Sequence, residues 1–352
     1  MSRAAHGDRI ACLTGIAPWK RGRIAAMLAP GRRLAYRADA AVAVETAARH
    51  GGALACWATR VPPDLPELAL SRAVPLWLIE DGFVRSAGLG AALVQPCSIV
   101  VDRLRPHYDP GGASDLENLL AKIDLDQRRR QRAADLIQRL VSADITKYNL
   151  AGERVALPEG RPVVLVVGQV DSDASLQFGG YGLTSRDLLE RAKRERGDAF
   201  IVYRPHPDVT AGLRDGHVDG LADLVAAHAP ITQLIEAADE VHVLTSLAGF
   251  EALLRGRRVV VHGGPFYAGW GLTDDRQQIA RRTRRLSREE LVYGALIAYP
   301  LYANPKSGKR CEIEELIDEL VRVTRPDKVG AIRRMVGKVA LGLEKFRSGG
   351  RV

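Results

Sequence analysis

The chain has 352 residues, of which 46% are hydrophobic and 26% are charged, so it is globular and long enough for two domains. Its four cysteines form no CxxC pair, which argues against a disulfide framework or a zinc site. The net charge of +9 suits anionic partners, but the basic runs are not interleaved with aromatic residues, which argues against nucleic acid.

In the first half of the chain, short apolar runs alternate with longer stretches of helical period, a pattern typical of α/β proteins. Buried parallel strands are expected in four segments: 9–16, 54–59, 75–82 and 97–102. Helices are expected in three segments: 20–30, 38–51 and 114–149.

The second half begins again with a strand at 161–169 that is too apolar for a sheet edge. Segments 185–208 and 231–263 each predict a helix leading into a strand that ends in a polar turn. The two glycines and two prolines of GERVALPEGRP mark a boundary between the halves near 151–161. The sequence therefore predicts two Rossmann-like domains facing an interdomain cleft, over 1–155 and 156–325, followed by a basic tail at 326–352.

Ligands of open α/β sheets bind just past the carboxyl ends of the strands, so the residues that end each apolar run are the candidates for chemistry. The first run to end in acids is LIEDG, which places Glu80 and Asp81 before a glycine. One of two adjacent carboxylates can serve as a general base, because its neighbour's charge raises its pKa. The alternative is an Asx turn or a helix cap formed by Asp81.

A second pair of acids, Asp171 and Asp173, follows the strand at 161–169 within the small-residue segment VVGQVDSDAS. Either acid can cap a helix. Either can instead be a carboxylate nucleophile at a sugar carbon, which needs small neighbours for close approach. Gln169, at the end of the same strand, is assigned to the donor-binding residues.

The hexapeptide YRPHPD places His206 between two prolines directly after an apolar strand. Pro207 forces the histidine into an extended conformation, and Pro205 fixes its own φ. A histidine braced in this way suits a phosphate ligand, and Arg204 adds a positive charge. A turn histidine bonded to the backbone is the alternative.

A fourth strand ends at Thr245 and Ser246, and a helix is expected to begin at about Leu247–Ala248. The N–H groups of a helix N-terminus bind phosphate, and the two hydroxyls assist. Glu251, in the first turns of this helix, is placed to accept the hydroxyls of a ribose. Ordinary helix capping explains the same residues when the segment is taken alone.

Together these strand ends indicate a transferase that uses a nucleotide-activated donor bound mainly by the second half. No DxD-type metal motif lies in a suitable place, so we expect neither a metal nor a further cofactor to be required.

Five motifs occur in an order that resembles the capsular polysaccharide biosynthesis family: EDGFVRS, VVGQVDSDASLQFGGYGL, YRPHPD, TSLAGFEALLRGRRVVVHGGPFYAGWGLTDD and YPLYANPKSGKRCEIEELI. The resemblance runs from about Ile10 to about Arg322. It implies a GT-B fold and a retaining transferase that moves the acidic keto sugar Kdo from CMP-β-Kdo. The acceptor is expected to be an anionic capsular glycan or a lipid-linked glycan.

The resemblance also implies roles for individual residues. Asp173, rather than Asp171, is implied as the nucleophile, and Asp81 as the acid–base residue with Glu80 as its substitute. His206 and Ser246 are implied to contact the CMP phosphate, and Glu251 the ribose. The carboxylate of the sugar needs a cation, for which Arg85 and Arg204 are candidates.

One departure from the family pattern and two alternative functions remain open. Well-known family members carry two such modules in tandem, whereas this chain has one. A GT-B-like sugar-nucleotide epimerase would use similar residues without an acceptor, and a non-catalytic partner in a capsule synthesis complex is a third hypothesis. Trp19 and Lys20 resemble an early family segment that lines the acceptor side; a packed helix start is the alternative.

The location of the protein is predicted from what the sequence lacks and from its tail. No signal peptide and no apolar stretch of membrane-spanning length is recognisable, so we expect a cytoplasmic protein. The tail 326–352 places apolar residues on one helical face and basic residues opposite, which suits peripheral binding to the inner membrane. A last helix packed across both domains is the alternative.

Overall fold

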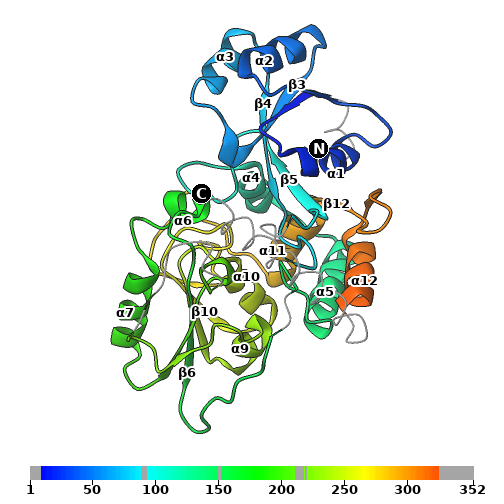
Figure 1. The fold of residues 1–352 in the computed structure, drawn as a ribbon. Coiled ribbons are helices and arrows are strands. Elements are labelled where there is room, and N and C mark those ends of the chain that lie inside the picture. Colours follow the sequence, from blue (N-terminus) through cyan, green and yellow to red (C-terminus); the bar gives the residue numbers. More distant parts are fainter. Residues whose placement is uncertain (1–8, 89–92, 150–151, 211–217, 219, 325–352) are drawn as a thin grey trace, which may run out of the picture.

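The computed structural model describes residues 9–88, 93–149, 152–210, 218 and 220–324, which form a mixed α/β protein with two sheets (Figure 1). The predicted α/β class is confirmed. The predicted helix of the tail 326–352 lies outside the described residues. Among the described helices, none is both long enough and apolar enough to span a membrane.

The first sheet has the strand order β13-β12-β5-β4-β3-β1-β2. Its strands are β1 (Ile10–Thr14), β2 (Ala35–Tyr36), β3 (Ala53–Trp57), β4 (Leu76–Asp81), β5 (Ser98–Asp102), β12 (Leu301–Ala303) and β13 (Arg310–Cys311). Strands β2, β1, β3 and β4 are parallel. The helices between them are α1 (Pro18–Leu28), α2 (Ala40–Arg49) and α3 (Leu65–Ser71).

Strand β5 corrects the prediction that all strands of the first half are parallel, because it runs antiparallel to β4. The chain turns back directly after β4: the Gly82 N–H donates to Ser98 O, and the Cys97 N–H donates to Arg85 O. The described part of this connection contains no helix. A parallel return needs a crossover, usually helical, so this connection brings the strand back antiparallel.

The second sheet is entirely parallel, with the order β11-β10-β9-β6-β7-β8. Its strands are β6 (Val163–Val167), β7 (Phe200–Arg204), β8 (Leu224–Val225), β9 (Glu240–Val243), β10 (Arg258–Val261) and β11 (Asp274–Asp275). Every residue of β6 is buried, as expected for a central strand covered on both faces. The helices of this half are α6 (Ala174–Gly179), α7 (Ser185–Glu195), α8 (Pro207–Thr210), α9 (Ile231–Ala237) and α10 (Leu247–Leu254).

The remaining helices are α4 (Asp115–Lys122), α5 (Gln127–Ser142), α11 (Arg288–Val292) and α12 (Ile313–Thr324), with a π-helical turn at Tyr293–Ala298. The segment 114–149, for which one helix was expected, contains two, because the Asp126 carboxylate accepts from the Arg129 N–H and starts α5 afresh. Helices α5 and α12 lie side by side, joined by Arg132 and Glu314 at 2.8 Å (Figure 1).

The chain crosses back to the first sheet near its end. Strand β12 pairs with β5, and β13 pairs with β12, although both lie within the range 156–325. One apolar cluster contains residues from α4 and α5, from strands of the second sheet and from α12. The same cluster contains Val100 of β5 and Tyr302 of β12, so the two sheets share one apolar core.

Candidate active site

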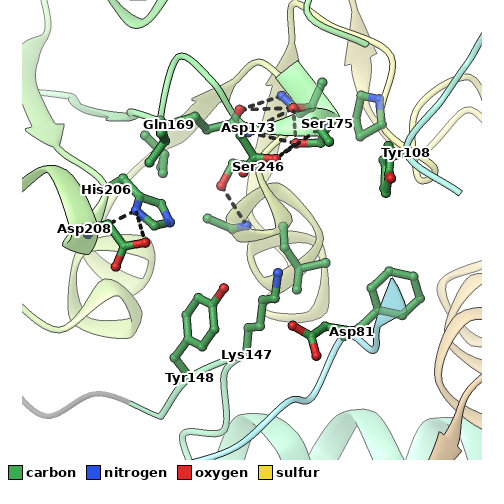
Figure 2. A pocket seen from close by; sticks show the side chains of 18 of the residues that line it. Asp81, Tyr108, Lys147, Tyr148, Gln169, Asp173, Ser175, His206, Asp208 and Ser246 are labelled. Atoms are coloured by element: carbon green, nitrogen blue, oxygen red, sulfur yellow. Dashed lines mark hydrogen bonds and ion pairs between the residues drawn. The ribbon is translucent and has the colours of Figure 1, made fainter. Parts of the chain in front are cut away.

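A pocket of about 840 Å³ lies where the carboxyl ends of β4, β6, β7 and β9 meet. This volume is in the upper part of the range for small-molecule sites. Ten of the eleven predicted side chains line it: Glu80, Asp81, Gln169, Asp173, Arg204, His206, Pro207, Thr245, Ser246 and Glu251. The acids of the first sheet therefore face the residues of the second across one space (Figure 2).

Arg85, the eleventh predicted residue, does not line the pocket. Its side chain is only 1% exposed, and it lies behind Asp81 with Nε 2.9 Å from Oδ2 of that carboxylate. Its Nη1 donates to Ser86 Oγ at 2.8 Å. Arg85 therefore supports Asp81 from behind the pocket. The family resemblance had implied a different role, a direct contact with the carboxylate of the sugar.

The two acids of β4 have different surroundings. Asp81 Oδ2 also lies 3.6 Å from Lys20 Nζ, so this carboxylate contacts two cationic side chains. Glu80 accepts only the Asp81 N–H among its side-chain hydrogen bonds to described residues, at 3.1 Å. Burial, with the charge of Asp81, raises the pKa of Glu80 to about 8. Glu80 is therefore protonated near neutral pH, beside an acid that is paired with two cations.

A glycine is required at position 82 because strand β5 lies too close to leave room for a side chain. A Cβ at this position would lie 2.4 Å from Ser98 Oγ, because β5 returns directly beside the end of β4. A larger residue would displace the two acids that precede it.

Asp173 is the N-cap of α6, as one of the alternatives predicted. Its Oδ1 accepts from the Ser175 N–H at 3.0 Å and from Ser175 Oγ at 3.1 Å. Ser175 Oγ also lies 3.1 Å from Thr245 Oγ1, which accepts from Gln169 Nε2 at 2.9 Å. Gln169 and Thr245 thus position the carboxylate through Ser175, while the side-chain bonds of Asp173 to described residues all use Oδ1 (Figure 2).

His206 is oriented by the start of α8. The Asp208 N–H donates to Nδ1 of the imidazole at 3.1 Å, so the neutral ring carries its proton on Nε2 (Figure 2). Burial lowers the pKa of His206, although the charges of Asp208 and Asp173 oppose this. The geometry therefore provides a neutral histidine with an N–H to donate.

Helix α10 begins at Leu247, where the sequence predicted it, and Ser246 is its N-cap with Oγ accepting from the Ala248 N–H at 3.3 Å. The buried Glu251 accepts the Lys147 N–H at 2.8 Å through Oε1. Burial raises the pKa of Glu251 to about 7. One helix thus presents a hydroxyl and a carboxyl group to the same wall.

The segment GGPFYAGWG (263–271) supports this wall from behind. Tyr267 Oη donates to Ser246 O, and Trp270 Nε1 donates to Phe266 O at 2.8 Å. The ring of Phe266 stacks on Phe83 with centroids 4.5 Å apart. Because Phe83 follows β4 and Phe266 follows β10, the motif also joins the pocket loops of the two sheets.

Several pocket residues were missed by the sequence analysis: His107, Tyr108, Lys147, Tyr148 and Phe178. Most of them follow β5 or α5 rather than a parallel strand, so the strand-end rule did not apply to them. Lys147 and Tyr148 lie within TKYN, which the sequence placed inside the helix expected over 114–149, whereas α5 ends at Ser142. Burial lowers the pKa of His107 to about 3, so this ring is neutral.

Three side chains outside the pocket bring metal-binding atoms within 4.8 Å of one another: Glu195, His242 and His262. Arg276 Nη2 already lies 2.6 Å from Glu195 Oε2. His242 Nδ1 and His262 Nε2 are 3.2 Å apart, which a hydrogen bond explains. Glu195 and the two facing ring nitrogens thus already have partners within the protein.

Comparison with known proteins identifies the same family as the five sequence motifs. The family described as "Capsule polysaccharide biosynthesis protein" matches residues 126–310, just over half of the chain. The lipopolysaccharide-processing protein LpsZ of Rhizobium meliloti is 36% identical over 332 residues, which cover 90% of this chain and 75% of that protein. This chain belongs to the capsule polysaccharide biosynthesis protein family.

Another relative within the family is longer. The capsule polysaccharide modification protein LipA of Neisseria meningitidis serogroup A is 39% identical over 287 residues. The match covers 78% of this chain but only 41% of LipA, so the chain spans about two fifths of that protein.

Two solved structures of Thermosulfurimonas dismutans KpsC share the fold. The part described as a beta Kdo 2,4 transferase has a TM-score of 0.78 at 28% identity, covering 89% of this chain and 98% of that one. The part described as a beta Kdo 2,7 transferase has a TM-score of 0.74 at 32% identity, covering 90% and 100%. The family and the fold of this chain are thus established together.

Proposed function

We propose that the chain is a retaining glycosyltransferase that moves Kdo from CMP-β-Kdo to a capsular glycan or lipid-linked acceptor. Its two sheets would be the two Rossmann-like domains of a GT-B fold, with the pocket as the interdomain cleft. The names and folds of the two KpsC structures support this substrate class. The observation that carries the proposal is that Asp81 from one sheet and Asp173 and His206 from the other line one pocket.

In the first step, an oxygen of Asp173 attacks the anomeric carbon of the donor sugar. The bond from that carbon to the CMP phosphate breaks, and the electron pair leaves with the phosphate. The N–H of His206 donates a hydrogen bond to the departing phosphate, and the Ser246 hydroxyl assists. The product of this step is a sugar ester of Asp173 with inverted configuration.

In the second step, Asp81 takes the proton of an acceptor hydroxyl, which attacks the anomeric carbon and releases Asp173. A second inversion restores the original configuration, so a β donor gives a β product. Arg85 and Lys20 form ion pairs with Asp81 that hold its carboxyl group in place. The protonated Glu80 beside it limits the negative charge that the anionic substrates meet.

The decisive test is to incubate the protein with CMP-Kdo and a Kdo-terminated glycan and to follow the release of CMP and the product by nuclear magnetic resonance. We expect CMP and a new β linkage, whose position the spectrum defines. An epimerase would change the sugar without using an acceptor. A non-catalytic partner would release no CMP, and that result would contradict the proposal.

The pKa of Glu80 also predicts a pH dependence. Because this pKa is raised to about 8, the group is uncharged below that pH and becomes a second negative charge beside Asp81 above it. We expect kcat/KM for the anionic donor to fall above about pH 8, by at most about tenfold per pH unit. A Glu80→Gln variant, neutral at every pH, should lose this alkaline decline. A variant with the same decline as the wild type would exclude Glu80 as its cause.

A further inference from the structure

The backbone of Lys147, a pocket residue, is held by hydrogen bonds to both halves of the molecule. Its backbone N–H donates to Glu251 of α10 at 2.8 Å. Its backbone oxygen accepts from the N–H groups of Arg85 and Ser86, which follow β4, at 3.0 and 3.3 Å. The side chain extends from this anchored backbone into the pocket, between Tyr148 and Asp81 (Figure 2).

The ammonium of Lys147 lies in the field of both candidate catalytic acids. Burial opposes its charge, but the Tyr148 oxygen and the carboxylates of Asp81 and Asp173 together raise the pKa of Lys147. Neither acid uses it as its main partner: Asp81 is paired with Arg85, and Asp173 is bound to Ser175. The lysine is therefore a cation beside both acids, available to an anionic ligand.

The other cationic side chain that lines the pocket, Arg204, donates hydrogen bonds to the backbone of the protein. Arg204 Nε donates to Ala229 O at 3.2 Å, and its Nη1 donates to Pro205 O at 2.8 Å. The two pocket histidines, His107 and His206, are neutral near pH 7 because burial lowers the pKa of each. Among the described residues that line the pocket, Lys147 is thus the cation best placed to bind an anion.

The donor carries two kinds of anion, the sugar carboxylate and the CMP phosphate, and the chemistry of the sugar indicates which of them Lys147 can reach. In Kdo, the carboxylate is attached to the anomeric carbon itself, the atom on which Asp173 and the acceptor act. A group that binds this carboxylate must therefore lie beside both acids, where Lys147 is found. The CMP phosphate lies on the side of His206 and Ser246 in the proposed complex.

We propose that Lys147 binds the carboxylate of the donor sugar and thereby selects sugars that are acidic at the anomeric carbon. The proposal rests on the proposed function and replaces Arg85 and Arg204 as the candidates for this contact. It makes Lys147 the residue that distinguishes acidic keto sugars from neutral sugars carried on the same nucleotide.

The test compares Lys147→Met with Lys147→Arg and with Lys309→Met, which removes the same charge from an exposed residue outside the pocket. CMP release from CMP-Kdo and the affinity for CMP alone are measured for each folded variant. We expect Lys147→Met to lower kcat/KM for CMP-Kdo about 100-fold, since a charge-assisted hydrogen bond is lost, and to change CMP affinity less than about threefold. Lys147→Arg should retain part of the activity, and Lys309→Met all of it.

The outcomes separate this proposal from the function on which it rests. Equal losses of CMP affinity and of donor turnover in Lys147→Met would assign Lys147 to the phosphate and overturn the proposal. So would a Lys147→Met variant as active as the wild type. A wild-type protein that releases no CMP from CMP-Kdo would overturn the proposed function, and this proposal with it. If Lys147→Met does not fold, retention of at least a tenth of the wild-type kcat/KM by Lys147→Arg supports the proposal, and a full loss contradicts it.

Discussion

Replacing Asp173 with Asn is expected to lower the rate of sugar transfer by about 1000-fold or more, because an amide cannot form the covalent intermediate. The helix should survive the change, since Asn caps helices as well as Asp and its side-chain oxygen can still accept from the Ser175 N–H. The affinity for CMP should therefore remain close to that of the wild type. Steady-state CMP release and a CMP titration measure the two effects.

Asp171 provides the matched control for this variant. It lies two residues earlier in the same loop, is exposed and does not line the pocket. Asp171→Asn makes the same chemical change and should leave the transfer rate unchanged. Equal activity of Asp173→Asn and the wild type would exclude Asp173 as the nucleophile, and a loss in Asp171→Asn would show that the loop, rather than one carboxylate, is needed.

Replacing Asp81 with Asn is expected to impair both stability and the second half of the reaction. Arg85, at 1% exposed, would lose its charged partner, which should lower the free energy of unfolding by about 2 kcal/mol. Transfer to the acceptor should fall about 100- to 10 000-fold, because the general base is gone. Glu80 is protonated below about pH 8 and cannot replace it at neutral pH.

For Asp81→Asn, the effects on the two half-reactions are expected to differ. The first step needs Asp173 and His206 but not a base, so Asp81→Asn should still release one equivalent of CMP per protein from CMP-Kdo. Rapid-quench measurement of this burst, with urea unfolding for stability, tests both parts. Asp64→Asn, which changes an exposed acid outside the pocket, is the control. A variant that transfers normally would exclude Asp81 as the base.

The side of the site formed by parallel strands could be predicted from the sequence. Asp81, Asp173, His206 and Ser246 each follow an apolar run, and the carboxyl ends of β4, β6, β7 and β9 meet at one pocket. The rule needs to know where each apolar strand ends, which hydrophobic patterning supplies, and it holds for these four strands because each is parallel to at least one neighbour. The fold class and the start of α10 at Leu247 follow from the same local signals.

The remaining features depend on long-range contacts that have no local signal. Strands β12 and β5 pair although about 200 residues separate them in the sequence, so the pattern near either strand cannot predict the pairing. Spacing along EDGFVRS did not reveal that Arg85 points back at Asp81, away from the pocket. Lys147 gains its position through backbone bonds to Glu251 and Arg85, which only the folded chain brings together.

The most direct measurement is mass spectrometry of the protein incubated with CMP-Kdo alone, without an acceptor. We expect the protein to gain the mass of one Kdo residue, peptide fragmentation to place it on Asp173, and Asp173→Asn to gain nothing. A sugar bound to another residue, or continued β-linked product formation by Asp173→Asn with no adduct in either protein, would contradict this expectation.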